Sequence, residues 1–324
     1  MDSIITVSIV QSALELGLIY ALVALALFIS FSILNIADLS TDGCFTLGCA
    51  VCASITIAGH PIIGLFAAIA AGVCSGYVTA FLQTRMGIQS ILAGIIVNTG
   101  LYTVNIAVMG FSSNLNLFNC DSIFTWAKET IPCSWYKLIV VMIIVIAVAI
   151  IVALFLNTRL GLSIRATGDN PDMVRASSIN TAKMITIGLC VANALTALSG
   201  GLLAQYQKSC DINLGTGMVT IALASLVIGE TLIGKGSMLK RITGVILGSC
   251  LYRFIVAVAL RLNVPAECLK LVSALIVAVA IALPYIRDKA GFYKKRHETR
   301  EQNQIYIREI MAGVNKEDGG RQDD

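Results

Sequence analysis

Residues 138–157 read LIVVMIIVIAVAIIVALFLN, a run of twenty residues without a single charge. A helix of about 20 apolar residues covers the ~30 Å hydrocarbon core of a bilayer, so this run predicts a membrane-spanning helix. We therefore predict an all-α, polytopic membrane protein with about nine hydrophobic segments. The other eight are six long runs and two shorter ones that suit tilted or broken helices: 4–34, 62–83, 89–110, 184–206, 242–262 and 269–286, then 43–58 and 218–233.

The composition of the whole chain agrees with this prediction. Hydrophobic residues make up 57% of its 324 residues and charged residues only 13%, whereas soluble domains carry about 25% charged residues. With a mean hydropathy of +0.84, the chain is too apolar for a cytosolic enzyme, a disordered protein or a secreted disulfide scaffold. A net charge of +4 indicates no nucleic-acid partner. The first apolar run lacks a signal-peptide pattern, so we expect it to be retained.

Charge is concentrated at the C-terminal end of the sequence. Residues 285–324 hold nine Lys or Arg and eight Asp or Glu, a far higher density than in the apolar body. We therefore predict a transmembrane domain over residues 1–287 and a polar cytoplasmic tail over residues 288–324.

Lys and Arg predict which loops face the cytoplasm, where they are enriched. The loops 158–183 and 234–241 are basic, the stretch after the last apolar run is basic, and Arg85 occupies a short turn. We expect all four on the cytoplasmic side. Nine full crossings would then put the N-terminus outside, whereas one re-entrant segment would put it inside, and both remain open. The opposite side receives the remaining loops: 111–137, 207–217 and 263–268.

A candidate internal repeat relates two parts of the chain at an offset of 150 residues. Residues 81–108 laid on residues 231–258 give seven identities in 28 positions, and Arg85 falls on Lys235. Many transporters are built from such repeats, with the solute path at the interface between them.

The polar stretch NIADLSTDG, residues 35–43, separates two apolar runs. Asp38 and Asp42 are costly near a membrane unless they face a cavity, a partner or an interface. Gly43 permits close backbone approach, and Ser40 and Asp42 are good N-cap residues for the helix that follows. The stretch is either a capped turn at the interface or a broken helix that lines a solute path, and the residues alone favour neither.

The loop LGLSIRATGDNPDMVRASSIN, residues 160–180, combines turn and helix signals. Its GDNP sequence, residues 168–171, is a turn followed by Pro at a helix start. We predict a short helix over residues 172–178. A short polar helix between two membrane spans has the right shape to dock into a groove of a cytoplasmic partner, and a long solvated loop is the alternative.

Three ionisable residues lie inside apolar runs: Glu15, Glu230 and Arg253. Arg253 is eleven residues into its span, about 17 Å deep, so its charge needs a partner or water. It either pairs with an acidic side chain, Glu230 being the first choice, or contacts a solute carboxylate. The spans also contain asparagines that serve as interhelical hydrogen-bonding groups or line a path: Asn98, Asn105 and Asn193.

The sequence lacks the motifs of several kinds of chemistry. There is no Walker A motif for ATP hydrolysis and no nucleophile or zinc-protease motif. The chain has two histidines, and the cysteines at 44, 49 and 52 have no interleaved metal ligands. We predict neither a metal site nor a cofactor. A disulfide between Cys120 and Cys133 remains open.

The ordered motifs quoted above resemble those of the branched-chain amino acid and ribose type of ABC importer permease. The resemblance is strongest to the tryptophan/tyrosine-type branch and covers about residues 10–287. It is carried by the 165–180 loop and by these segments: LELGLIYAL from 14, DLSTDG from 38, LAGI from 92, GLY from 100, AQY from 204, VIGE from 227 and LYR from 251.

The resemblance implies an all-helical permease subunit in the cell membrane of a prokaryote, acting as a homodimer or beside a homologous permease. A cytoplasmic ABC ATPase subunit would drive it, and an extracytoplasmic binding protein or lipoprotein would deliver a small solute, an aromatic amino acid first. Residues 168–178 would form the helix that docks on the ATPase. The expected path residues are Asn35, Asp38, Ser40, Asp42, Gly43, Phe45, Asn98, Tyr102, Glu230 and Arg253, and the expected coupling residues are Arg165, Gly168, Asp169, Asn170, Pro171, Arg175 and Asn180.

Two other functions remain as alternatives. The same machine could carry a branched-chain amino acid, a sugar or a nucleoside. An ion-coupled secondary carrier would instead use Asp38, Asp42 and Glu230 as coupling acids.

Overall fold

The computed structural model describes residues 7–130, 134–234 and 236–261, with six further residues from 271 to 282. The chain divides into two compact units, Met1–Val277 and Ala278–Asp324, and the elements below belong to the first. The predicted tail over 288–324, most of the predicted segment 269–286 and Cys133 lie outside the described residues.

Within these residues the fold is helical apart from one two-stranded antiparallel sheet. The segment η1 is a π-helical continuation of α1. The elements are α1 (Val7–Leu27), η1 (Phe28–Ile33), α2 (Thr41–Ile57), α3 (Pro61–Thr84), α4 (Ser90–Val108), β1 (Asn114–Asn116), α5 (Ile123–Thr130), α6 (Tyr136–Asn157), α7 (Arg159–Asp169), α8 (Pro171–Ala176), α9 (Thr181–Gln207), β2 (Ser209–Asp211), α10 (Met218–Ile233) and α11 (Met238–Arg261).

Among the described helices, six are long and apolar enough to cross a membrane: Ser8–Ile33, which joins α1 to η1, and α3, α4, α6, α9 and α11. The helices α2 and α10 are apolar but shorter. These eight coincide with eight of the predicted segments, including the two expected to be short, so the all-α membrane fold is confirmed.

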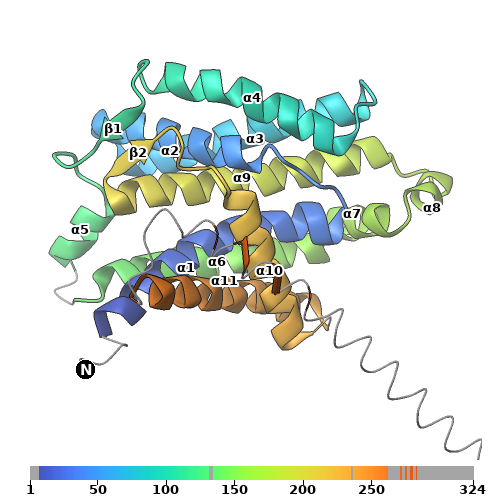
Figure 1. The fold of residues 1–324 in the computed structure, drawn as a ribbon. Helices are drawn as coiled ribbons and strands as arrows, with labels where there is room; N and C mark the ends of the chain where they lie inside the picture. The colour runs from blue at the N-terminus through green and yellow to red at the C-terminus, as the bar shows by residue number, and fades with distance from the viewer. Residues whose placement is uncertain are drawn as a thin grey trace, which may run out of the picture. The chain divides into compact units, whose positions relative to one another are not determined.

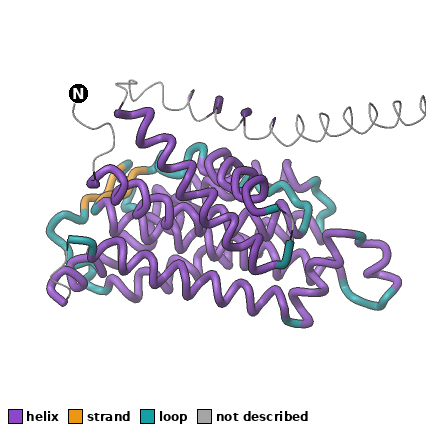
Figure 2. Tube along the Cα trace, turned by 90° about the horizontal axis from the view of Figure 1, so that it is seen from below, coloured by secondary structure: helices purple, strands orange, loops and turns teal. Residues whose placement is uncertain are grey.

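The two most buried spans, α1 and α9, lie at the centre of the bundle. In Figure 1, α2, α3 and α4 lie on one side of α9, and α6 and α11 lie beside α1. Figure 2 shows the same helices running alongside one another, with the two strands at one end. The central pair is buried because neighbouring helices cover most of its apolar side chains, whereas the outer helices keep an exposed apolar face.

The loops gather at two ends of the bundle. At the end called here the strand end, β1 pairs with β2, Asn114 opposite Asp211, and Gln11 near the start of α1 donates a hydrogen bond to the Ser134 carbonyl. The other end, called here the basic end, holds α7, α8 and the Arg85 turn. The described parts of the loops 111–137 and 207–217, which the Lys and Arg count predicts to share a side, therefore do lie together.

Two of the membrane crossings are broken, which means that a non-helical segment interrupts each of them. The chain leaves η1 at the basic end and returns as an extended segment before α2 begins at Thr41. Asn35 adopts a left-handed φ of 56° at this reversal. Likewise, residues 212–217 separate β2 from the start of α10. The starts of α2 and α10 meet, because the Gly215 N–H donates a 3.1 Å hydrogen bond to Thr46 Oγ1.

The two segments of the candidate repeat fall on matching elements. Residues 81–108 cover the end of α3, a turn and α4, and residues 231–258 cover the end of α10, a turn and α11. Both turns connect two apolar helices, which is the arrangement that the sequence offset predicts.

Candidate functional site

Asp38 anchors the break between η1 and α2. Its carboxylate is buried. Oδ1 accepts hydrogen bonds from the Ser40 N–H at 2.8 Å and the Ser40 hydroxyl at 2.6 Å, and Oδ2 accepts one from Asn193 Nδ2 of α9 at 2.9 Å. The Thr79 hydroxyl of α3 donates to Ser40 Oγ at 3.2 Å. The broken segment is therefore attached to α9 by a hydrogen bond to the Asp38 carboxylate and to α3 by a hydrogen bond to the Ser40 hydroxyl.

Asp42 joins the two broken crossings. Although it lies in the first turn of α2, its carboxylate accepts the N–H groups of Gly217 and Val219, both at 2.9 Å, at the start of α10. Carboxylates stabilise helix N-termini, where backbone N–H groups lack intrahelical partners. The expectation that Asp42 or Ser40 caps α2 is wrong: Ser40 holds the N-cap position without a side-chain cap bond, and Asp42 caps α10 instead.

A polar cleft of about 320 Å³ opens beside Asp42. Four predicted path residues line it together: Asp42, Gly43, Asn98 and Tyr102. Five more polar residues and one apolar residue complete the lining: Thr46, Thr99, Asn105, Asn213, Thr216 and Ile212. Among the described residues of its lining there is one carboxylate and no basic group. Apart from the Asp42 carboxylate, the polar groups of the lining are amides and hydroxyls, which form hydrogen bonds without a fixed charge.

The remaining predicted path residues do not line this cleft. Asp38 and Ser40 lie behind it in the buried network described above. Phe45 is fully buried and packs against Tyr20 of α1, with ring centroids 6.3 Å apart. Asn35 is exposed next to η1. Phe45 therefore belongs to the core between α1 and α2.

Glu230 forms an ion pair with Arg241. The Arg241 Nη2 atom lies 2.8 Å from Glu230 Oε1, and it also donates to Ser32 Oγ of η1 at 2.7 Å. The Ser32 hydroxyl donates to the same carboxylate at 2.8 Å, and the Arg241 guanidinium stacks 4.8 Å from the Phe28 ring. These contacts tie η1, α10 and α11 together.

The expected pairing of Glu230 with Arg253 is therefore wrong. In the sequence analysis, Arg241 is one of the basic residues of the loop 234–241. The packing of α10 on α11 brings its side chain to Glu230. Arg253 instead stacks on Tyr20 at 4.5 Å and donates to the Tyr20 hydroxyl at 3.2 Å. Glu15 accepts hydrogen bonds from Gln11 and from the Tyr206 hydroxyl. Each intramembrane charge thus has polar or aromatic contacts.

A double-mutant cycle tests the Glu230–Arg241 pair. Arg241→Met should destabilise the protein by about 2 kcal/mol, because it leaves a part-buried carboxylate without its cation. Adding Glu230→Gln should recover much of that loss. Arg253 lies twelve residues, about 18 Å, further along the same helix, so Arg253→Met with Glu230→Gln should be additive. Thermal unfolding in detergent measures the three single variants and the two double variants. Coupling of Glu230 to Arg253 rather than Arg241 would contradict the assignment.

The 160–180 loop forms two helices rather than one. The predicted helix over 172–178 is α8 (Pro171–Ala176), and α7 (Arg159–Asp169) precedes it. Asn170 caps α8 by accepting the N–H groups of Asp172 and Met173, both at 3.1 Å. Asn180 caps α9. The helix α7 is absent from the sequence prediction, although Thr158, which caps it, is a start signal that could have found it.

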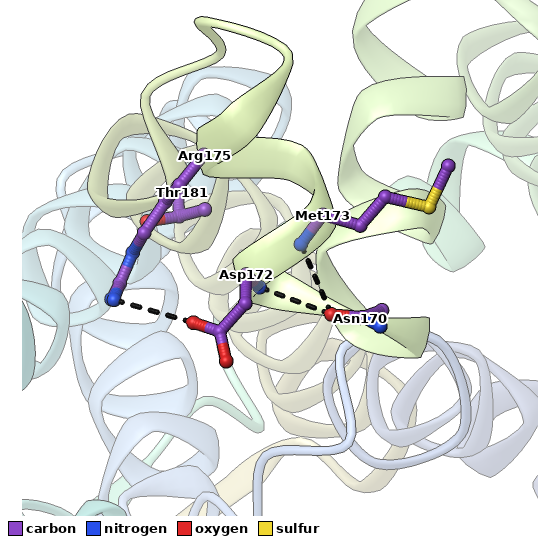
Figure 3. Close-up of polar contacts among 5 residues, drawn as sticks. All are labelled: Asn170, Asp172, Met173, Arg175 and Thr181. Atoms are coloured by element: carbon purple, nitrogen blue, oxygen red, sulfur yellow. Dashed lines mark hydrogen bonds and ion pairs between the residues drawn. The ribbon is translucent and has the colours of Figure 1, made fainter.

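The outer surface of α8 is exposed and polar. Arg175 forms an exposed ion pair with Asp172 at 3.6 Å and donates through Nε to Thr181 Oγ1 at 3.3 Å. Figure 3 shows Arg175 and Asp172 on one side of α8 and the Met173 side chain extending to the other. Met173 is 69% exposed. A rigidly capped helix with an exposed apolar tip and exposed charges is suited to docking.

The underside of this loop contacts the broken crossing. A Cβ atom at Gly168 would overlap the carbonyl oxygen of Ile33, so the backbones of α7 and η1 are in direct contact. Of the other predicted coupling residues, Asp169 is exposed and Arg165 is half-buried on α7. The loop that carries α8 is therefore packed on the segment that leads through Asp38 to Asp42.

Comparison with known proteins shows the family to which this chain is similar. The family described as "Branched-chain amino acid transport system / permease component" matches residues 9–282. The chain is 34% identical over 272 residues to the tyrosine transport system permease protein of Clostridioides difficile (strain R20291), covering 84% of this chain and 90% of that protein.

Two further relatives match over most of their length. A Rickettsia prowazekii (strain Madrid E) protein described as uncharacterized is 30% identical over 289 residues, covering 85% of this chain and 97% of that protein. The ribose import permease protein of Escherichia coli (strain K12) is 27% identical over 254 residues, 75% of each chain. No solved structure matches the chain.

The family and the Clostridioides difficile and Escherichia coli relatives are described as permease components of transport systems, not as enzymes. The several apolar helices agree with a multi-pass protein of a prokaryotic plasma membrane. The family match spans nearly all of the described fold, including the cleft beside Asp42 and the α7–α8 loop. The chain therefore belongs to the branched-chain amino acid transport system permease family, and it is the permease of an ABC-type transporter.

Proposed function

We propose that this chain forms the translocation path of an ATP-driven importer for a small solute, an amino acid, with an aromatic one favoured. The observation that supports this best is a continuous packing route between two surfaces. At the basic end, α8 offers a docking surface, and Gly168 of the same loop packs on Ile33 of η1. The segment after η1 carries Asp38 and leads to the polar cleft at Asp42.

The basic end then faces the cytoplasm, where a separate ABC ATPase subunit binds α8. A binding protein or lipoprotein delivers the solute at the strand end. Because α1 starts beside Ser134 at the strand end, this orientation puts the start of α1 outside the cell. The permease acts as a homodimer, and residues 288–324 form a cytoplasmic tail. Nothing in this mechanism needs a metal or cofactor in the permease.

The solute class follows from the relatives and the cleft together. The tyrosine transport relative favours an amino acid, and Tyr102, which is 52% exposed in the cleft lining, offers a ring for stacking. The ribose import relative supports a second candidate, a sugar. Amides and hydroxyls in the cleft suit either solute.

Reconstitution in proteoliposomes tests the proposal. The chain with its ATPase subunit and binding protein should take up labelled tyrosine only with ATP, and leucine and ribose less well. Arg175→Glu should lower uptake and solute-stimulated ATPase activity at least tenfold, because it reverses the charge on α8. Arg159→Glu makes the same charge change on exposed residue 159 of the basic end, outside α8, and should have little effect.

Three results would contradict parts of this proposal. Uptake by the permease alone, driven by an ion gradient, would favour a secondary carrier. ATP-dependent uptake of ribose in preference to every amino acid would replace the solute. Wild-type coupling in a folded Arg175→Glu variant would show that Arg175 does not contribute to the contact between α8 and the ATPase.

A further inference from the structure

A second cleft lies at the basic end between the last turns of α3 and the first turns of α9. It has a volume of about 380 Å³, and Tyr77, Phe81 and Arg85 line it on the α3 side, with Lys183 and Ile187 on the α9 side. It is separate from the polar cleft beside Asp42, which shares none of these residues. Apart from Asn180, which caps α9 and is one of the predicted coupling residues, its lining residues belong neither to the predicted transport path nor to α8.

The cleft lies next to a stretch where α3 and α9 pack closely. In the middle of α3, Gly72 and Gly76 lie against the α9 backbone, where a Cβ would crowd Asn193 and Cys190. Small residues allow this close approach. Towards the basic end, larger side chains that include Phe81, Arg85 and Lys183 line a space that is open to the surroundings.

The mouth of this cleft is cationic. Arg85, which ends α3, and Lys183, in the first turn of α9, are both exposed. Neither forms an ion pair with another described residue, and the part of the lining that the structure describes has no acidic side chain. Two unpaired cations at one opening favour an anionic group with several acceptor oxygens, such as a phosphate.

The deeper wall is apolar and extends into the membrane-spanning part of α3. Tyr77 is 56% exposed and Phe81 44% exposed, and their rings lie 6.5 Å apart. Tyr77 is eight residues from Arg85, about 12 Å along the helix, so it lies within the hydrocarbon region. A cytoplasmic protein at Arg85 would not reach this wall. A lipid presents both a charged head and apolar chains over that distance.

We propose that this cleft binds an anionic phospholipid, with its phosphate between Arg85 and Lys183 and its acyl chains along Tyr77, Phe81 and Ile187. Basic pockets between membrane helices have this affinity for anionic headgroups. The site needs only the membrane-spanning fold and the two cations. It therefore stands independently of the solute and of the ATPase contact.

Native mass spectrometry of the purified full chain, titrated with phosphatidylglycerol or phosphatidylcholine, tests the site. Wild type should bind phosphatidylglycerol at least tenfold more tightly than phosphatidylcholine. Arg85→Gln and Lys183→Gln should each weaken phosphatidylglycerol binding about fivefold, since one cation near an anionic surface contributes on that scale. The matched control is Arg159→Gln with Lys240→Gln, which removes two exposed charges of the same end outside the cleft and should leave binding unchanged.

Arg85→Lys with Lys183→Arg keeps both charges and should keep binding, which separates charge loss from misfolding. Equal affinity for the two lipids, or an equal loss in the control variant, would overturn the proposal. Binding of glycerol 3-phosphate or inorganic phosphate as tightly as the lipid would assign the site to a soluble anion. If a variant with both Arg85→Gln and Lys183→Gln still binds lipid but no longer associates with the ATPase, the surface belongs to the ATPase contact.

Discussion

Asp42→Ala should lower the free energy of unfolding by about 3 kcal/mol. The carboxylate accepts two backbone N–H groups at the start of α10, those of Gly217 and Val219. Loss of an N-cap acceptor costs about 1 kcal/mol at exposed helix ends, and an unsatisfied buried donor costs 1–3 kcal/mol. Both donors lose their partner at once, and the starts of α2 and α10 lose their link. Thermal unfolding in detergent measures the loss.

Two variants show whether that loss comes from the shared carboxylate. Asp42→Asn keeps one acceptor oxygen, so it should lose about half as much stability as alanine. Asp211→Ala removes another carboxylate that accepts a backbone N–H, that of Asn213, but in an exposed turn, and it should cost less than about 1 kcal/mol. Equal losses for Asp42→Ala and Asp211→Ala would show that Asp42 is an ordinary local cap.

The helical fold could be predicted from the sequence because membrane spans are local. A run such as 138–157 satisfies its own backbone hydrogen bonds and needs no partner to be recognised. The short lengths of α2 and α10 also follow from their own sequences. The α7 helix was missed because it is polar and follows α6 after a single residue, so its only signal is Thr158.

The polar contacts inside the bundle could be predicted only in part. Asp38 and Asp42 stood out because carboxylates are costly in a membrane, yet their partners, Asn193 on α9 and Gly217 before α10, lie more than 150 positions away. Such pairings depend on which helix faces meet. The same reason explains the wrong pairing of Glu230 with Arg253, since the register of α10 on α11 decides that Arg241 reaches Glu230.

The tight contact at Gly168 was also invisible in the sequence. The GDNP turn predicts a helix start at Pro171, which the structure confirms as the first residue of α8. The sequence does not show that the preceding glycine touches the end of η1. That contact gives the loop a second role, because Arg175 faces outward while Gly168 faces the broken crossing.

Gly168→Val should uncouple the transporter while leaving its ATPase attached. A valine side chain would overlap the Ile33 carbonyl, so α7 must move away from η1. Overpacking of this kind costs about 1–3 kcal/mol. The exposed surface of α8 keeps its residues and its Asn170 cap, so ATPase association should remain. Solute-stimulated ATPase activity and uptake should fall at least tenfold, because movement of α8 no longer reaches the segment leading to Asp38.

Gly100→Ala is the matched control, since a Cβ at Gly100 of α4 meets no atom within 4 Å. It should keep coupling and be neutral or slightly stabilising, because alanine favours a helix over glycine by about 1 kcal/mol. Arg175→Glu should differ from Gly168→Val by losing ATPase association as well as activity. Wild-type coupling in a folded Gly168→Val permease would show that the contact with Ile33 only packs the loop, and coupling would then have to reach the cleft by another route.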